Sequence, residues 1–255
     1  MKIASWNVNS LKVRLAHLQA WCEAAQPDLL ALQELKLEDP AFPWAEVRAL
    51  GFDAAVSGQK TYNGVAILSR PPLHDVVAGI PGYTDPQRRV LAATVAGIRV
   101  VDLYVVNGQA LDSEKFQYKL EWLQALHAYL AAELQRHPQM VVLGDFNIAP
   151  EDRDVHDPEA WFEQVLCSSA ERAALARLLA LGFSDSFRLC EDGGGQFSWW
   201  DYRASAFRRN RGLRIDLILV SAALRSRVRA AGIDRSPRSW ERASDHAPVW
   251  VEIET

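Results

Sequence analysis

Cysteine is scarce in this sequence, and the few that occur are not arranged as a structural or catalytic site. Cys22, Cys167 and Cys190 are the three cysteines among 255 residues. Their number is odd and none are spaced as in a C-x-x-C motif, which argues against a disulfide framework and a zinc knuckle. No cysteine lies near the polar motifs described below, so thiol nucleophilic catalysis has no support. A reducing cellular interior fits this composition best.

Long apolar segments are also missing. No stretch approaches the roughly 18 consecutive apolar residues of a membrane-spanning helix, and residues 1–6 lack the apolar core of a signal peptide. We therefore expect no membrane association and a cytoplasmic location. The sequence has no G-x-x-x-x-G-K-[ST] motif either, which excludes nucleotide hydrolysis of the P-loop kind.

The charge balance is weakly acidic overall but uneven along the chain. The formal net charge is −4, yet residues 201–255 hold 11 Lys and Arg against 7 Asp and Glu, a net +4. The other 200 residues therefore carry −8. A basic end on an acidic body suggests one face for an anion. The alternative is an arginine-rich surface that contacts only solvent.

The composition is that of an ordinary globular protein, with 49% hydrophobic and 24% charged residues. A chain of this length can bury a core without a metal or disulfide to hold it together. We find no internal repeat and no linker that divides the sequence. We therefore expect one domain over residues 1–255.

Strand-like and helix-like segments alternate from end to end. Apolar patterns predict strands at residues 2–6, 29–32, 52–56, 64–68, 90–95, 100–106, 140–144, 197–200, 215–220, 228–233 and 249–253. Helical spacing predicts helices from Leu11 to before Pro27, from residue 112 to 136, and from a capping box at Ser168 to residue 181. Gly97 between two strand candidates indicates a hairpin.

Several connections are too short for a parallel crossover, which favours mixed or antiparallel sheets covered by helices on their outer faces. Polar side chains occur where many of the apolar runs meet a loop. Because strand ends and neighbouring strand starts share an edge in an antiparallel sheet, we expect these side chains to converge. The set is Asn7, Glu34, Tyr104, Asp145, Asn147, Asp216, Asp245 and His246.

This set is rich in hard oxygen ligands and contains a single histidine. Such a combination suits Mg²⁺ or Mn²⁺ and suits zinc or copper poorly. A histidine among carboxylates can remain protonated and donate to a phosphate. The residues therefore predict a divalent-cation site that acts on a phosphate group.

Five motifs follow one another along the chain, each containing some of these polar residues. They are Trp6-Asn7-Val8-Asn9, Leu32-Gln33-Glu34-Leu35-Lys36, Gly144-Asp145-Phe146-Asn147, Asn210-Arg211-Gly212-Leu213-Arg214-Ile215-Asp216 and Ser244-Asp245-His246. In this order they resemble the exonuclease III family of abasic-site repair nucleases, in the endonuclease-exonuclease-phosphatase superfamily. The resemblance runs from Lys2 to Trp250, and Phe197–Arg203, Gly58–Lys60 and Gln87–Arg89 also share it.

The resemblance implies a DNase I-like α/β (α+β) fold, a four-layered sandwich of two mixed, largely antiparallel sheets flanked by helices. It implies a metal-dependent phosphodiesterase site at the sheet edge. Glu34 would bind the metal, with Asn7 and Asp245 close by as direct or water-mediated ligands. Asp145 and Asn147 would complete the metal-binding set.

The resemblance also implies catalytic roles. Asp145 would orient or deprotonate the attacking water, and Asn147 would position that water or the phosphate. His246 would donate to a non-bridging phosphate oxygen, while Asp216 holds its ring. Tyr104 would contact the phosphate or help the leaving oxygen. The implied step is in-line attack on phosphorus that expels a 3′-oxygen.

The expected partner is double-stranded DNA with abasic sites or blocked 3′ ends, bound by a monomer of bacterial type. Phosphate contacts set orientation without reading sequence. The side chains that we expect to contact DNA are Arg88, Trp199, Trp200, Arg203, Arg211 and Arg214, although tryptophans are more often core than ligand.

Several positions depart from the family pattern. Leu35 stands where relatives often place a hydroxyl residue, Val106 where they often place a proline, and Leu213 where some place a tryptophan. Residues 166–171 lack the Phe-Leu-Pro-Glu-Glu-Arg sequence of the family. These departures leave open the balance between abasic-site incision and 3′-end processing. One alternative is a nonspecific nuclease or phosphatase branch of the superfamily, which usually has a second histidine at the position of Tyr104. Another is a non-catalytic DNA-binding relative.

Overall fold

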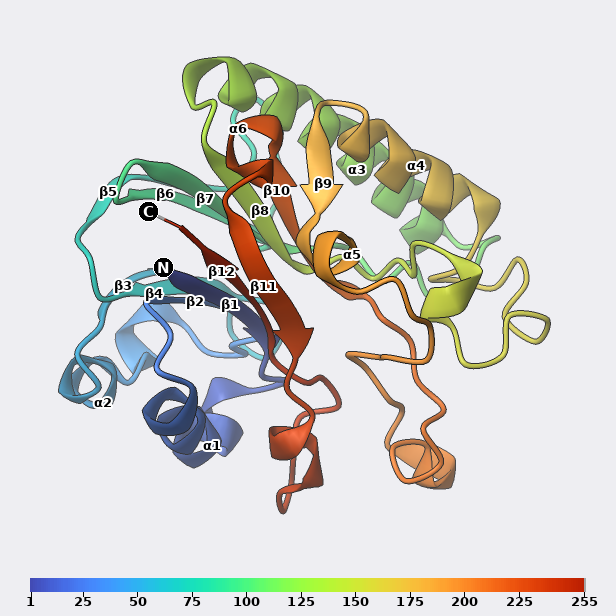
Figure 1. Ribbon diagram of the computed structural model, residues 1–255, viewed down its shortest axis with the longest axis horizontal. Helices are drawn as coiled ribbons and strands as arrows, with labels where there is room; N and C mark the ends of the chain where they lie inside the picture. Colours follow the sequence, from blue (N-terminus) through green and yellow to red (C-terminus); the bar gives the residue numbers. More distant parts are fainter. Residues whose placement is uncertain (255) are drawn as a thin grey trace.

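Two six-stranded β-sheets form the centre of the computed structural model, which describes residues 1–254 (Figure 1). The first sheet contains β1 (Lys2–Asn7), β2 (Leu29–Gln33), β3 (Asp53–Ser57), β4 (Val65–Ser69), β11 (Val228–Ile233) and β12 (Val249–Ile253). The second contains β5 (Leu73–Ala78), β6 (Val90–Val95), β7 (Ile98–Tyr104), β8 (Met140–Asp145), β9 (Phe183–Asp185) and β10 (Asp216–Ser221).

The two sheets have the same number of strands and the same mixture of directions. Their strand orders are β11-β12-β1-β2-β4-β3 and β5-β6-β7-β8-β10-β9. In each sheet one central pair is parallel, β1 with β2 and β7 with β8, and the other pairs are antiparallel. The prediction of mixed, largely antiparallel sheets is confirmed.

Helices cover the outer face of each sheet, as Figure 1 shows. On the first sheet lie α1 (Leu11–Ala25) and α2 (Trp44–Ala49), and on the second lie α3 (Glu114–Arg136) and α4 (Ser169–Leu179). Two shorter helices are α5 (Ser186–Cys190) and α6 (Ala222–Arg225). Single 3₁₀ turns occur at Asp39–Ala41, Asp152–Asp154, Arg203–Ser205 and Ser236–Ser239. Within residues 1–254, no helix combines the length and apolarity needed to cross a membrane.

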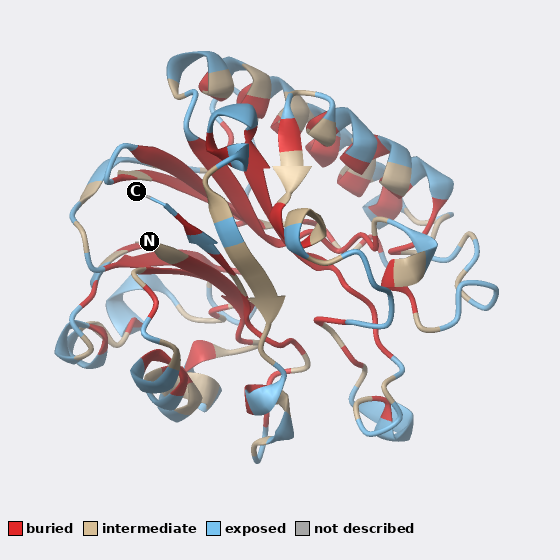
Figure 2. Cartoon of the chain, in the orientation of Figure 1, coloured by how far each residue is buried: buried red, intermediate tan, exposed pale blue. Residues whose placement is uncertain are grey.

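The core consists of layers that alternate with the sheets, and the buried residues in Figure 2 follow them. Between the sheets, side chains such as Ile67 and Val141 pack together. Outside the first sheet, Trp21 of α1 packs against Trp6 of β1 in a second cluster. Outside the second sheet, Leu126 of α3 belongs to a third cluster with β6, β7 and β8. Helix, sheet, sheet and helix thus form the four layers that were expected.

Local structure agrees with the sequence where the patterns are strong. Gly97 (φ 78°) and Ala96 (φ 48°) turn β6 into β7, which confirms the hairpin. Ser168 and Glu171 form the predicted capping box of α4. The prediction of a strand at residues 197–200 was wrong, because Trp199 forms isolated bridges to two different loops instead of a ladder. The strands β5 and β9 and the helices α2, α5 and α6 were not predicted.

Candidate active site

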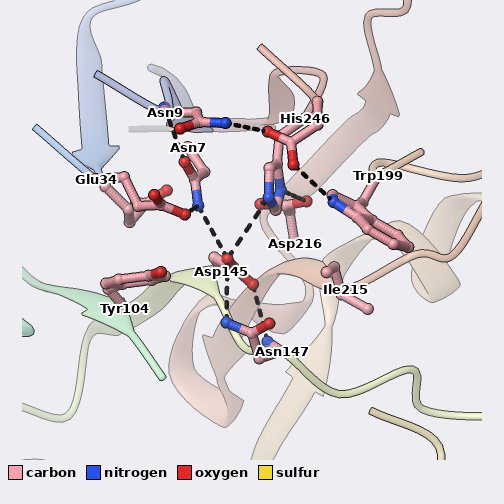
Figure 3. Close-up of polar contacts among 12 residues, drawn as sticks. Asn7, Asn9, Glu34, Tyr104, Asp145, Asn147, Trp199, Ile215, Asp216 and His246 are labelled. Carbon is pink, nitrogen blue, oxygen red and sulfur yellow. Dashed lines mark hydrogen bonds and ion pairs between the residues drawn. The ribbon is translucent and has the colours of Figure 1, made fainter. Parts of the chain in front are cut away.

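The strand register aligns several of the expected side chains at one edge. Tyr104 on β7 is paired with Asp145 on β8, and Asp145 is paired with Asp216 on β10. In the other sheet, Asn7 ends β1 and Glu34 directly follows the adjacent parallel strand β2. Figure 3 shows the two groups directed toward each other across the edge of the sandwich. The convergence that we expected from the sequence is present.

Asp145 lies at the centre of the group and is 1% exposed. Its Oδ2 accepts from Asn7 Nδ2 at 3.0 Å, and its Oδ1 accepts from the backbone N–H of Asn147 at 2.9 Å. Burial raises the pKa of the Asp145 carboxyl to about 7, although the nearby His246 imidazolium opposes this. A carboxylate with a pKa near neutrality is well matched to taking a proton.

His246 is held by two carboxylates. Its Nδ1 lies 2.9 Å from Asp216 Oδ2, and its Nε2 lies 3.8 Å from Asp145 Oδ2. Burial alone would lower the pKa of His246, but the carboxylates of Asp216 and Asp145 raise it to about 10. The ring is therefore a proton donor at neutral pH. Asp216 fixes its orientation, as such carboxylate partners do.

Gly144 allows Asp145 to occupy its place. Gly144 has φ 139°, and a Cβ added there would lie 1.9 Å from the carbonyl oxygen of Leu103. A side chain at this position would force β7 and β8 apart immediately before Asp145. The close approach of β7 to β8 therefore explains why the G-D-F-N motif begins with glycine.

Glu34 and Asp145 could hold a metal ion together, with the His246 ring beside them. Ligand atoms of Glu34, Asp145 and His246 all lie within 4.8 Å of one another. Glu34 Oε1 accepts from Asn7 Nδ2 at 2.9 Å, and its Oε2 is 2.9 Å from Lys36 Nζ. Two carboxylates this close, one of them partly exposed to solvent, fit a hard divalent cation that keeps several waters. Asn7 contacts both carboxylates and thus links them.

Asp245 lies next to this group and is not one of the three. Its Oδ1 accepts from Asn9 Nδ2 at 2.9 Å, and its Oδ2 accepts from Trp199 Nε1 at 3.0 Å. Burial alone would raise its pKa, but His246 and these donors lower the pKa of the Asp245 carboxyl. Asn9 was missed from the sequence, although it stands in the Trp6-Asn7-Val8-Asn9 motif. A role for Asp245 as a water-mediated ligand stays a prediction.

Tyr104 and Asn147 complete the expected set. Burial, together with Glu34 and Asp145, raises the pKa of Tyr104 well above its usual value, so the phenol stays neutral and can donate. Asn147 has φ 50°, and its Oδ1 accepts from Asn107 Nδ2 at 3.0 Å. Asn107 was also missed, although it directly follows the strand predicted at residues 100–106.

The residues expected to contact DNA divide into two groups. Arg88, Arg203 and Arg211 are exposed, and the Arg203 side chain is 89% exposed. Trp199 is half-buried beside Asp245. Residues 201–211 form part of the orange loop that extends from the lower edge in Figure 1. These four side chains are accessible to a ligand at the surface.

Arg214 and Trp200 need correction. Arg214 is 1% exposed and forms ion pairs with Asp154 at 2.6 Å and Asp185 at 2.7 Å. Trp200 is fully buried and packs edge-on against Phe207. Neither side chain reaches the surface, so both belong to the interior. The sequence could not reveal the acidic partners of Arg214, which come from distant segments.

A groove continues from Glu34 and Tyr104 away from His246. It has a volume of about 310 Å³. Three cations line it, namely Lys36, Arg89 and Lys115, together with the exposed ring of Tyr62. We did not assign these side chains from the sequence, although Lys36 and Arg89 lie in segments that share the family resemblance. Their positive charge suits the binding of a phosphate group next to Glu34 and Tyr104.

Comparison with known proteins identifies the class. The model of the Endonuclease/Exonuclease/phosphatase family matches residues 4–246. Exodeoxyribonuclease III of Haemophilus influenzae is 37% identical, with 99% of this chain and all of that protein covered. The structure of NExo, a 3′–5′ exonuclease from Neisseria meningitidis, is 51% identical with a TM-score of 0.98, and an AP endonuclease from Archaeoglobus fulgidus is 37% identical with 0.96; each comparison covers both chains completely.

The chain therefore belongs to the Endonuclease/Exonuclease/phosphatase family. It is a DNA-repair nuclease of the exodeoxyribonuclease III and AP endonuclease type, which hydrolyses phosphodiester bonds. The family is metal-dependent, and the carboxylates of Glu34 and Asp145 are a fitting place for the metal.

Proposed function

We propose that this nuclease acts mainly on 3′ ends of duplex DNA, where it removes a terminal phosphate or nucleotide, and that it incises internal abasic sites poorly. The observation that carries this proposal is an apolar cluster beside Trp199. Leu166, Leu213 and Ile215 pack together there and are each at most 5% exposed.

We propose that a flipped sugar would have to enter the site on the side that this cluster fills. Trp199 bridges both His246 and Leu213, so the apolar wall begins next to the catalytic histidine. Leu166 adopts φ 77°, a conformation that favours glycine, and its side chain contributes to the buried wall. An enzyme that acts on an internal site must house the extruded residue in a pocket. A 3′-phosphate end avoids this requirement because the chain stops at the scissile phosphate.

A relative supports the same preference. NExo from Neisseria is described both as a 3′ phosphatase bound to product DNA and as a 3′–5′ exonuclease, at 50% and 51% identity. The AP endonuclease from Archaeoglobus fulgidus is less similar, at 37% identity. The chain thus has its higher identity with an enzyme of 3′ ends.

The residues at the site fit one reaction for 3′ ends and for internal abasic sites. Asp145 takes a proton from the water that attacks phosphorus, and Asn147 holds that water. His246 donates to a non-bridging oxygen, and the neutral phenol of Tyr104 donates a hydrogen bond to the phosphate or to the leaving oxygen. The bond between phosphorus and O3′ breaks, and the released oxygen takes up a proton from water to become a 3′-hydroxyl. Glu34 and Asp145 would hold a metal ion, which would supply charge neutralisation of the phosphate and leaving oxygen.

Magnesium is the metal that we propose, with manganese as the substitute, because the ligands are hard oxygens and His246 is engaged by Asp216. We further propose that a monomer binds duplex DNA through Arg88, Arg203 and Arg211, and through the cationic groove of Lys36 and Lys115. These contacts would position the duplex without reading its sequence.

The test compares three duplexes that differ only at the reacting position: a recessed 3′-phosphate, an undamaged recessed 3′ end and an internal abasic site. With Mg²⁺, we expect kcat/KM to be highest for the 3′-phosphate and lowest for the abasic site, by at least about tenfold. A chelator should abolish all three activities, and Mn²⁺ should restore them. Equal or faster incision at the internal site would overturn the proposed preference.

A further inference from the structure

Lys119 is a fully buried lysine beneath the active-site loop, and none of the roles above uses it. It lies on α3, and its side chain is 0% exposed. Its Nζ donates to the backbone carbonyl of Asn147 at 2.7 Å and to that of Asn107 at 3.1 Å. It also forms an ion pair with Glu171, whose side chain is 0% exposed as well. One ammonium group thus holds the main chain of two residues that face the reacting centre.

Glu171 links Lys119 to the apolar wall at Leu166. Its Oε1 accepts from the backbone N–H of Leu166 at 3.0 Å, in addition to Lys119. Its Oε2 accepts from the N–H of Ser168 at 3.1 Å and from the hydroxyl of Ser168 at 2.6 Å. The left-handed turn at Leu166 is therefore fixed by the carboxylate that pairs with Lys119.

Asn147 needs such support because its backbone is in the left-handed region, at φ 50°. Its Nδ2 donates to the carbonyl of Val105 at 2.9 Å and to Asp145 Oδ2 at 3.2 Å. Its N–H donates to Asp145 Oδ1 at 2.9 Å. A shift of the Asn147 carbonyl would move both contacts to Asp145. The backbone anchor at Lys119 therefore acts on the side chain that takes the proton.

A buried ion pair is weak evidence for stability, because desolvation offsets much of the attraction. The arrangement of this one is more informative. Apart from their contact with each other, Lys119 and Glu171 form their hydrogen bonds with loops that border the site, at Asn107, at Asn147 and at residues 166–168.

We propose that Lys119 and Glu171 are positioning residues, which set Asn147 against Asp145 and hold the Leu166 wall in place. They touch neither substrate nor metal. Their effect reaches the reaction through the main chain of Asn147 and Leu166. The proposal concerns the nuclease activity itself and does not depend on the preferred lesion.

The first variant is Lys119→Met, which replaces the cation by an apolar chain of similar length. We expect kcat to fall by about 10- to 100-fold, since misplacement of a reacting group by about 1 Å can cost 10²-fold. KM should change by less than about threefold, because the exposed arginines are untouched. Both constants are measured on the 3′-phosphate duplex and on the abasic duplex, and kcat should fall on whichever substrate the wild type cleaves.

Arg99→Met is the matched control. Arg99 Nε pairs with Glu133 at 2.7 Å, and both side chains are at most 3% exposed. Glu133 is also on α3, but near its C-terminal end, and the contacts of Arg99 lead to Asp75 and Thr94. This variant removes the cation of a comparable buried ion pair, whose acid, Glu133, lies far along α3 from Lys119. Its stability should fall, while kcat per folded molecule stays unchanged.

Glu171→Gln is the second variant, for the case in which Lys119→Met does not fold. It keeps the shape of the side chain and removes its charge, and we expect kcat to fall by at least about fivefold. Activity is normalised to the folded fraction measured by circular dichroism. Wild-type kcat in either folded variant would overturn the proposal, as would an equal fall in Arg99→Met. Failure of both variants to fold at low temperature, when Arg99→Met folds, would assign the pair to structure alone.

Discussion

At the centre of the site, the Asp145 carboxylate has two oxygens directed to different neighbours, and it is the group best placed to accept a proton. The change Asp145→Asn keeps the size and most hydrogen bonds but removes the base. We expect kcat to fall by about 10²–10⁴, while the affinity for duplex DNA is retained. Single-turnover kinetics and a binding assay measure the two effects separately.

Asp152→Asn serves as the control for that experiment. Asp152 is a largely exposed carboxylate in the connection between β8 and α4, where it pairs with Arg172 at 2.7 Å. Its replacement should leave kcat unaltered. Normal turnover by Asp145→Asn would contradict the role of the carboxylate.

Leu166 provides a second prediction at the level of a single residue. The change Leu166→Gly suits φ 77° and removes the side chain from the apolar wall. We expect the ratio of abasic-site incision to 3′-phosphate removal to rise by at least about tenfold, because pocket contacts set such discrimination. The two rates are compared with those of Ala96→Gly, which relieves a positive φ of 48° in the β6–β7 turn. An unchanged ratio in Leu166→Gly would remove the basis for the preference.

Among the secondary-structure elements, the central pair β7–β8 has the strictest requirement. The change Gly144→Ala would place a methyl group 1.9 Å from the Leu103 carbonyl oxygen. We expect a loss of stability about 2 kcal/mol greater than for Gly97→Ala, because overpacking costs about 1–3 kcal/mol. Gly97 has φ 78° and nothing within 4 Å of an added Cβ, so it isolates the backbone strain. Urea unfolding gives both values, and equal losses would argue against the clash.

The elements also explain how much of the site could be predicted. Asn7, Glu34 and Asp145 end or follow apolar runs, so the sequence pattern was enough to bring them to one edge. The segment around Trp199 was harder, since single bridges to two loops do not produce the alternation of a strand. Which of its side chains would be buried could not be read from spacing, and Trp200 was therefore placed wrongly.

For the whole molecule, the charge count overstated the basic surface. Arg214 is paired with Asp154 and Asp185, two acids that lie outside residues 201–255 and are therefore absent from the count for that segment. Asp154 lies in the acidic part of the chain, and only the folded structure brings it to the arginine. The two sheets share one apolar interface, which is compatible with one domain over residues 1–255. The assignment of residues 1–255 to a single domain stays a prediction.

The exposed arginines that remain should bind DNA through its backbone. Arg203 is paired only with its near neighbour Asp201, at 2.7 Å on the surface, and can exchange that contact for a phosphate. We expect Arg203→Ala to weaken binding equally on all sequences and to lower the slope of log K against log salt by about 1. Arg229→Ala, which removes another exposed arginine paired with Glu254, should leave both the affinity and the slope unchanged. A loss of affinity that varied with sequence would mean that Arg203 contacts bases, and a loss shared by Arg229→Ala would reduce the effect to net charge.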